Sequence, residues 1–135
     1  MKTKLRALAA LIAITSSTMA AAQAPPPPPP TPLHFAKGTS ATTVSGTVKG
    51  YGGKDYKLGA RAGQTMSVKL TSKNPSLYMN VLKPGGEALF NGSMSGASFS
   101  GALPETGDYV VQVYFMRNEA RRGASAPFSL NVAIK

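Results

Sequence analysis

Arginine is the residue type whose placement in this sequence points most directly to chemistry. Beyond residue 22 the chain has four arginines, and Arg117, Arg121 and Arg122 lie within six residues of one another. A guanidinium group offers a planar pair of donors that fits a carboxylate, which lysine cannot match. One helical turn would place Arg117 and Arg121 on the same face. The pattern predicts a binding site for an acidic partner, with Asn118 beside it. The alternative is a solvated basic turn that has Glu119 as its local counter-ion.

Tyr51 is the second candidate for a binding residue. It is the only bulky side chain in the loop Gly50-Tyr51-Gly52-Gly53. A tyrosine exposed between glycines is a common recognition residue, because it offers a large apolar ring with a polar tip. The alternative is that Tyr51 covers the edge of a sheet.

Enzymatic chemistry finds little support in the residue types. The chain has one histidine, His34, and no cysteine, which argues against thiol catalysis and His/Cys metal sites. A glycosidase needs two acids across a sugar; Glu105 and Asp108 are close in sequence, but they fall in a predicted turn, where solvated roles are the default. No G-x-S-x-G elbow, phosphate loop or dinucleotide fingerprint occurs. We therefore predict a protein that is not an enzyme, with no catalytic residue, cofactor or metal.

The arginines follow a predicted strand that must hold them in place. Thr106-Gly107-Asp108 is typical of a turn, and alternation begins directly after it. One face of the strand carries Tyr109, Val111, Val113 and Phe115, and the other carries Val110, Gln112, Tyr114 and Met116. A buried strand of this kind would present the arginine loop rigidly to a partner.

The rest of the chain reads as further short strands separated by Gly, Pro and Asn turns. The predicted segments are residues 42–49, 55–60, 65–72, 77–82, 87–91, 97–103 and 127–135, residues 33–35 are a candidate edge strand, and residues 91–96 are expected to be loop. This pattern predicts an all-β fold, a single jelly-roll-like β-sandwich of about seven or eight antiparallel strands.

The N-terminal segment has the features of a signal peptide. Three cations precede a short apolar run, and small residues then give an A-x-A pattern, which favours cleavage after Ala22. The alternative, an anchor helix, would need a longer apolar run. Residues 23–32 contain six consecutive prolines and read as a stiff polyproline spacer, although such a run could also dock an SH3-like groove. The β-sandwich domain then covers residues 33–135.

Charge and cysteine content narrow the partners and the compartment. The whole chain carries a net charge of +10, and loss of residues 1–22 would leave +7. Such a balance favours acidic clefts, anionic envelope polymers or nucleic acid. An exported domain without cysteines fits a bacterial periplasm, where disulfides are permitted but not required.

Several motifs together resemble the bacterial periplasmic inhibitors of g-type (goose-type) lysozyme. They are Lys49-Gly50-Tyr51, Tyr56, Ala62-Gly63-Gln64, Leu103-Pro104, Gly107-Asp108-Tyr109, Val113, the segment from Arg117 to Arg122, Asn131-Val132 and Ile134-Lys135. The resemblance spans roughly residues 35–135, and its R-N-x-A-R segment is its most specific part. The layout is also similar to the pre-peptidase C-terminal type of β-sandwich, which bears on the fold.

The resemblance implies a periplasmic protein that blocks the active-site cleft of a g-type lysozyme. We expect it to be a monomer or weak dimer. It implies contact residues at Tyr51, Arg117 and Arg121, with Asn118 and Arg122 as further candidates. An alternative is a periplasmic module that binds anionic glycan or envelope polymer through its general basic charge. A remote alternative is the DNA breaking-rejoining label of some relatives. Strand transfer would need a tyrosine supported by several arginines and histidines, so no nucleic-acid partner is expected.

Overall fold

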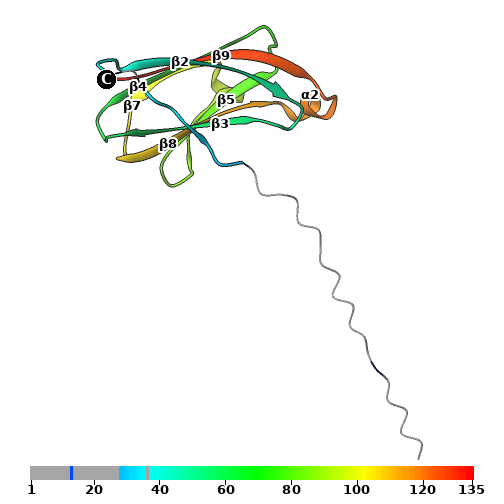
Figure 1. The fold of residues 1–135 in the computed structure, drawn as a ribbon, viewed down its shortest axis with the longest axis horizontal. Coiled ribbons are helices and arrows are strands. Elements are labelled where there is room, and N and C mark those ends of the chain that lie inside the picture. The colour runs from blue at the N-terminus through cyan, green and yellow to red at the C-terminus, as the bar shows by residue number, and fades with distance from the viewer. Residues whose placement is uncertain (1–12, 14–27, 36) are drawn as a thin grey trace, which may run out of the picture.

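A computed structural model gives the fold, and it describes residue 13, residues 28–35 and residues 37–135 (Figure 1). The predicted cleavage site after Ala22, and all of the predicted signal segment except residue 13, lie outside the described residues. In the described part, no helix has the length and apolar character needed to cross a membrane.

Nine strands form two facing sheets in the described residues (Figure 1). The five-stranded sheet has the order β1 (Thr31–Pro32), β3 (Lys54–Ala60), β8 (Gly107–Phe115), β5 (Leu77–Leu82), β6 (Ala88–Asn91). The four-stranded sheet has the order β2 (Ala41–Lys49), β9 (Ser125–Ile134), β4 (Thr65–Ser72), β7 (Ser98–Ala102). All neighbouring strands are antiparallel except β1 and β3. The predicted all-β sandwich is confirmed.

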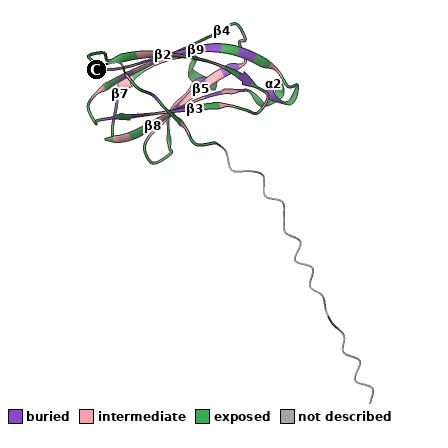
Figure 2. Ribbon diagram, viewed as in Figure 1, coloured by how far each residue is buried: buried purple, intermediate pink, exposed green. Residues whose placement is uncertain are grey.

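The core lies between the sheets and follows the predicted alternation (Figure 2). Every second residue of β8, from Tyr109 to Phe115, is buried, and so is every second residue of β9 from Ala126 to Ile134. Because successive side chains of a strand point to opposite faces, each of these strands contributes one apolar row to the core. The other rows are left to contact solvent or partners.

The structure corrects the predicted position of the first strand and the predicted start of the last strand. Residues 33–35 are not a strand. The edge strand is β1, two residues earlier, and buried Leu33 donates its amide to the Lys57 carbonyl oxygen at 2.8 Å. At the other end, β9 begins at Ser125 rather than residue 127. Pro127 is accommodated because β4 ends at Ser72, opposite Phe128, so no β4 residue lies opposite the proline.

The predicted loop at residues 91–96 contains a short helix, α1 (Gly92–Ser95). The Asn91 side chain accepts a hydrogen bond from the Ser93 amide at 3.1 Å, which is an N-cap. Gly92 is buried against β5, and a Cβ there would collide with the Met79 backbone. The helix therefore depends on a glycine contact that sequence alternation does not reveal.

Three connections that cross between the sheets lie at the same end of the sandwich, and two of them carry the candidate residues. Residues 50–53 link β2 to β3, and α2 (Arg117–Arg121) lies between β8 and β9. The register places them together, because Lys49 pairs with Ser125 and Lys54 pairs with Val113. In Figure 1, α2 lies at the opposite end of the molecule from the C-terminus.

Candidate functional site

The loop that carries Tyr51 is tied down by its neighbours while the tyrosine itself is exposed. Gly50 has a positive φ of 57°, and its amide donates to the Ala124 carbonyl oxygen at 2.8 Å. Gly52 donates to the Lys49 carbonyl oxygen at 2.9 Å, which closes a tight turn. The Tyr51 side chain is left 71% exposed. A fixed backbone under an exposed ring is the arrangement expected of a recognition residue.

The helix α2 forms where the predicted helical turn was placed. Ala120 is its buried residue, and Gly123, with φ of 70°, ends it in the left-handed region that favours glycine. The Gly50 backbone approaches the Ala120 carbonyl oxygen, since a Cβ on Gly50 would lie 3.5 Å from it. The Tyr51 loop and α2 are therefore direct neighbours.

The charged residues of α2 differ in whether they have partners. Arg122 pairs with Glu119 at 3.4 Å, and the Asn118 side chain accepts from the Glu119 amide at 2.9 Å. Among the described residues, no acidic side chain pairs with Arg117 or Arg121, and both are exposed. The two guanidinium groups are thus available to an external carboxylate, whereas Arg122 already has one inside the molecule.

A pocket of about 410 Å³ brings Tyr51 and Arg117 together. We call it the loop pocket, and it is lined by Gly50, Tyr51, Tyr114, Phe115, Met116 and Arg117. The structure does not place Arg121, Asn118 or Arg122 in its lining. It adds Tyr114 and Met116, which sequence reasoning assigned only to the outward row of the strand. Their alternation with buried residues was visible in the sequence, but their nearness to Tyr51 was not.

The loop pocket also gathers exposed apolar surface. Large hydrophobic side chains that remain exposed among the described residues are Tyr51 at 71%, Met94 at 84% and Met116 at 40%. Two of these three line the loop pocket. Exposed apolar groups collected beside a cation are typical of a protein-binding surface, and methionine adapts its shape to a partner.

No carboxylate in the described part of the chain lines the loop pocket, and Asp55 and Glu87 contact side chains of their own surroundings. Burial raises the pKa of Asp55 above its usual value, and a hydrogen bond from Gln112 partly opposes the rise. Lys83 binds Glu87 at 2.9 Å, and this contact lowers the pKa of Glu87. Across residues 28–35 and 37–135, no three His, Asp or Glu side chains gather as metal ligands. His34 is exposed, next to buried Leu33.

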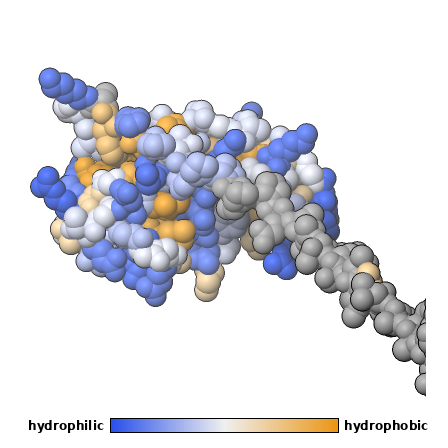
Figure 3. Space-filling model, turned by 60° about the horizontal axis from the view of Figure 1, so that its bottom comes forward, coloured by the Kyte–Doolittle hydropathy of each residue, from blue (hydrophilic) through white to orange (hydrophobic). Residues whose placement is uncertain are grey.

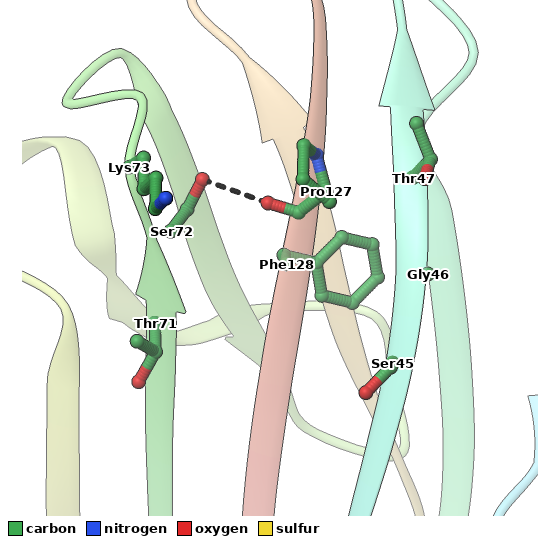
Figure 4. A pocket seen from close by; sticks show the side chains of 8 residues that line it. All are labelled: Ser45, Gly46, Thr47, Thr71, Ser72, Lys73, Pro127 and Phe128. Atoms are coloured by element: carbon green, nitrogen blue, oxygen red, sulfur yellow. Dashed lines mark hydrogen bonds between the residues drawn. The ribbon is translucent and has the colours of Figure 1, made fainter.

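A second pocket, of about 680 Å³, lies over the four-stranded sheet (Figure 4). Its lining comes from β2, β4 and β9 and the residue after β4: Ser45, Gly46, Thr47, Thr71, Ser72, Lys73, Pro127 and Phe128. The Ser72 hydroxyl donates to the Pro127 carbonyl oxygen at 3.1 Å. The lining holds hydroxyl groups and one lysine but no acid or histidine, so it offers no acid–base pair for catalysis.

Comparisons with known proteins agree on one family, although no protein-family model matches the chain. A solved structure of Aeromonas hydrophila PliG, described as a periplasmic lysozyme inhibitor of g-type lysozyme, is 40% identical with a TM-score of 0.70. The match covers 78% of this chain and 95% of that one. Salmonella Typhimurium PliG, described in the same words, is 28% identical with a TM-score of 0.64, covering 77% of this chain and 96% of that one.

A curated relative carries the same activity in its name. The inhibitor of g-type lysozyme from Escherichia coli (strain K12) is 27% identical over 107 residues, which are 76% of this chain and 79% of that protein. The fold and the sequence thus identify the same relatives that the sequence motifs resemble. Since the chain is 40% identical to Aeromonas PliG over nearly all of that structure, it belongs to the PliG family of periplasmic inhibitors of g-type lysozyme.

Proposed function

We propose that this protein inhibits g-type lysozyme by placing Arg117, Arg121 and Tyr51 in the active-site cleft of the enzyme. The observation that carries the proposal is that two crossover connections lie side by side, one with an exposed tyrosine and one with two arginines that have no acidic partner among the described residues. The relatives named as inhibitors of g-type lysozyme support the choice of partner.

The chemistry of the partner fits these side chains. A lysozyme cleft carries carboxylates for catalysis, and a guanidinium group that pairs with them occupies the space of the sugar. The net positive charge would also attract an acidic cleft over distance, so association should slow as salt is raised. Asn118 and Arg122 would act at the margin, since both already have contacts within α2.

We also propose that the protein works in the periplasm after removal of residues 1–22. Residues 23–30 would then serve as a spacer, because residues 31 and 32 of the expected spacer form β1 and belong to the domain. The description of the relatives as periplasmic supports this compartment. Mass spectrometry of the protein recovered from the periplasmic fraction tests it, because a chain that begins at Gln23 is expected.

The first experiment is a lysis assay with that purified protein against g-type, c-type and i-type lysozymes at two salt concentrations. Stoichiometric inhibition of the g-type enzyme alone is expected. If none of the enzymes is inhibited, the proposed function is wrong. Pull-down with isolated peptidoglycan and anionic polymers would then test the binding-module alternative, for which lysine substitutions should matter as much as arginine substitutions.

The second experiment tests the residues. Arg117→Ala and Arg121→Ala should each weaken inhibition by about 2 kcal/mol or more, roughly 30-fold, as central arginines of interfaces do. Arg61→Ala is the matched control, because Arg61 is exposed where β3 ends, at the far end from α2. All three variants should keep the melting temperature of the parent protein. Full inhibition by both α2 variants would refute the site assignment while leaving the inhibitor function standing.

A further inference from the structure

A pair of tyrosines occupies the outer face of the five-stranded sheet beside the loop pocket. Tyr78 of β5 and Tyr114 of β8 are directly opposite in register, with ring centroids 6.3 Å apart and planes at 41°. Both side chains are half-buried. Their neighbours along each strand, Leu77 and Phe115, are buried in the core, so the two tyrosines face away from it.

The ring of Tyr114 is held in position by a hydrogen bond to a neighbouring side chain on the same face of the sheet. Its hydroxyl donates to the Asn80 side-chain oxygen at 3.0 Å, and the same oxygen accepts from the Gly92 amide at 3.3 Å. Asn80 is therefore oriented by the start of α1 and in turn fixes the tyrosine. A ring that is already fixed loses little conformational entropy when a partner covers it.

The tyrosine pair is continuous with the loop that carries Tyr51. A Cβ on Gly53 would lie 3.6 Å from the Cβ of Tyr114 and 2.9 Å from the Val113 carbonyl oxygen. Gly53 thus lets the loop backbone lie directly on β8. Tyr114 also lines the loop pocket with Tyr51 and Arg117, so one surface runs from the loops onto the sheet.

The wider face is mixed rather than uniformly charged. Figure 3 turns the β3 and β8 side of Figure 1 toward the reader and shows hydrophobic surface broken up by hydrophilic side chains. Beyond the tyrosine pair, the next rung of outward residues is Asp55, Gln112 and Asn80. An aromatic pair next to amides matches the apolar centre and polar rim of a protein interface.

We propose that the tyrosine pair is a second contact area for g-type lysozyme. In this arrangement the arginines enter the cleft, and Tyr114 and Tyr78 receive the rim of the cleft beside it. The segment of the enzyme that binds here would carry an apolar side chain next to an acidic one. The apolar side chain would contact Tyr114 and Met116, and the acidic side chain would pair with Arg117. The proposal rests on the proposed function, because the occupant is the same enzyme.

The test measures association and dissociation rates of the full processed protein with g-type lysozyme. Tyr78→Ala and Tyr114→Ala should each raise the dissociation rate constant at least fivefold and change the association rate constant less than twofold. Tyr114→Phe keeps the ring but removes the bond to Asn80, and should raise the dissociation rate constant by a smaller factor. Leu82→Ala is the control, since Leu82 lies on the same outward row of β5, four residues beyond Tyr78. It should leave both rates unchanged.

The outcomes separate the two proposals. If the parent protein inhibits and both alanine variants dissociate at the parent rate, the second contact area is refuted and the inhibitor function stands. If Leu82→Ala dissociates as fast as Tyr78→Ala, the effect comes from the whole sheet face and the tyrosine pair is refuted as the contact. Where an alanine variant melts below the assay temperature, Tyr78→Ser and Tyr114→Phe decide the question. If the parent protein does not bind the enzyme at all, the failure belongs to the proposed function.

Discussion

Tyr109→Phe removes a single oxygen atom from the core, and its effect can be worked out from two hydrogen bonds. Tyr109 is fully buried at the start of β8. Its hydroxyl donates to the Glu105 carbonyl oxygen at 2.6 Å and accepts from the Glu105 amide at 3.1 Å. The side chain therefore fastens the turn before β8 to the core, and phenylalanine would keep the packing while losing both bonds.

The expected cost follows from these contacts. An intramolecular hydrogen bond contributes a net 0.5–1.5 kcal/mol, so two bonds contribute about 1–3 kcal/mol. Glu105 is exposed, and water can replace part of what its backbone loses. The lower part of the range, about 1–2 kcal/mol, is therefore expected. For a domain of about this size, each kcal/mol lowers the melting temperature by roughly 4–8 °C.

Urea denaturation, followed by circular dichroism, measures this difference directly. The midpoint should fall with no change in the slope, because the folded core stays intact. Tyr51→Phe is the matched control, since it removes the same oxygen from an exposed ring and should change stability by less than 0.5 kcal/mol or so. Inhibition below the transition should be unaffected, as Tyr109 and α2 lie near opposite ends of β8. If Tyr109→Phe is as stable as the parent protein, the reasoning from these two bonds is refuted.

Three further predictions concern two positions in the sheet packing and one carboxyl group. Leu130→Ala, at a fully buried position of β9, should destabilise the domain by about 2–5 kcal/mol in thermal or urea unfolding, and a neutral result would contradict the observed register. Gly46→Ala would bring a Cβ within 2.9 Å of the Phe128 ring, so a loss of about 1–3 kcal/mol is expected, partly restored by adding Phe128→Leu. Burial raises the pKa of Asp55, which means that its ionised form opposes folding. Asp55→Asn should therefore raise the free energy of unfolding at pH 7, and the gain should vanish below the usual carboxyl pKa of 3.8. A gain that is constant with pH would contradict this cause.

The strands were largely predictable because the alternation of apolar and polar residues that marks a strand is visible within a short stretch of sequence. Alternation along β8 depends only on which residues face the core, and the two faces of this strand came out as expected. The helix at Gly92 was missed because it depends on a close approach to Met79, thirteen residues away in sequence. The parallel strand β1 was missed because Thr31 and Pro32 show no alternation and are held only by pairing with β3.

Some residues of the candidate site could be predicted from the sequence, and others could be found only in the structure. Arg117, Arg121 and Tyr51 could be selected from residue type and local context. The inclusion of Tyr114 and Met116 in the loop pocket could not, since it requires the loop after β2 to lie against the end of β8. The internal pairing of Arg122 with Glu119 also became visible only in three dimensions. Sequence reasoning thus found the charged part of the surface and missed its aromatic part.

The pairing of β2 with β9 has a consequence for the timing of folding. In its own sheet β2 has one neighbour, and that neighbour is the last strand of the chain, with Ala41 opposite Ala133. A chain that emerges from its N-terminus must therefore leave β2 without its partner until almost every residue is available. The four-stranded sheet therefore cannot be completed until β9 is available. Loss of the last few residues would remove the pairing of Ala133 with Ala41 and of Ile134 with Met66 at once, so truncation there should destabilise both neighbours of β9 together.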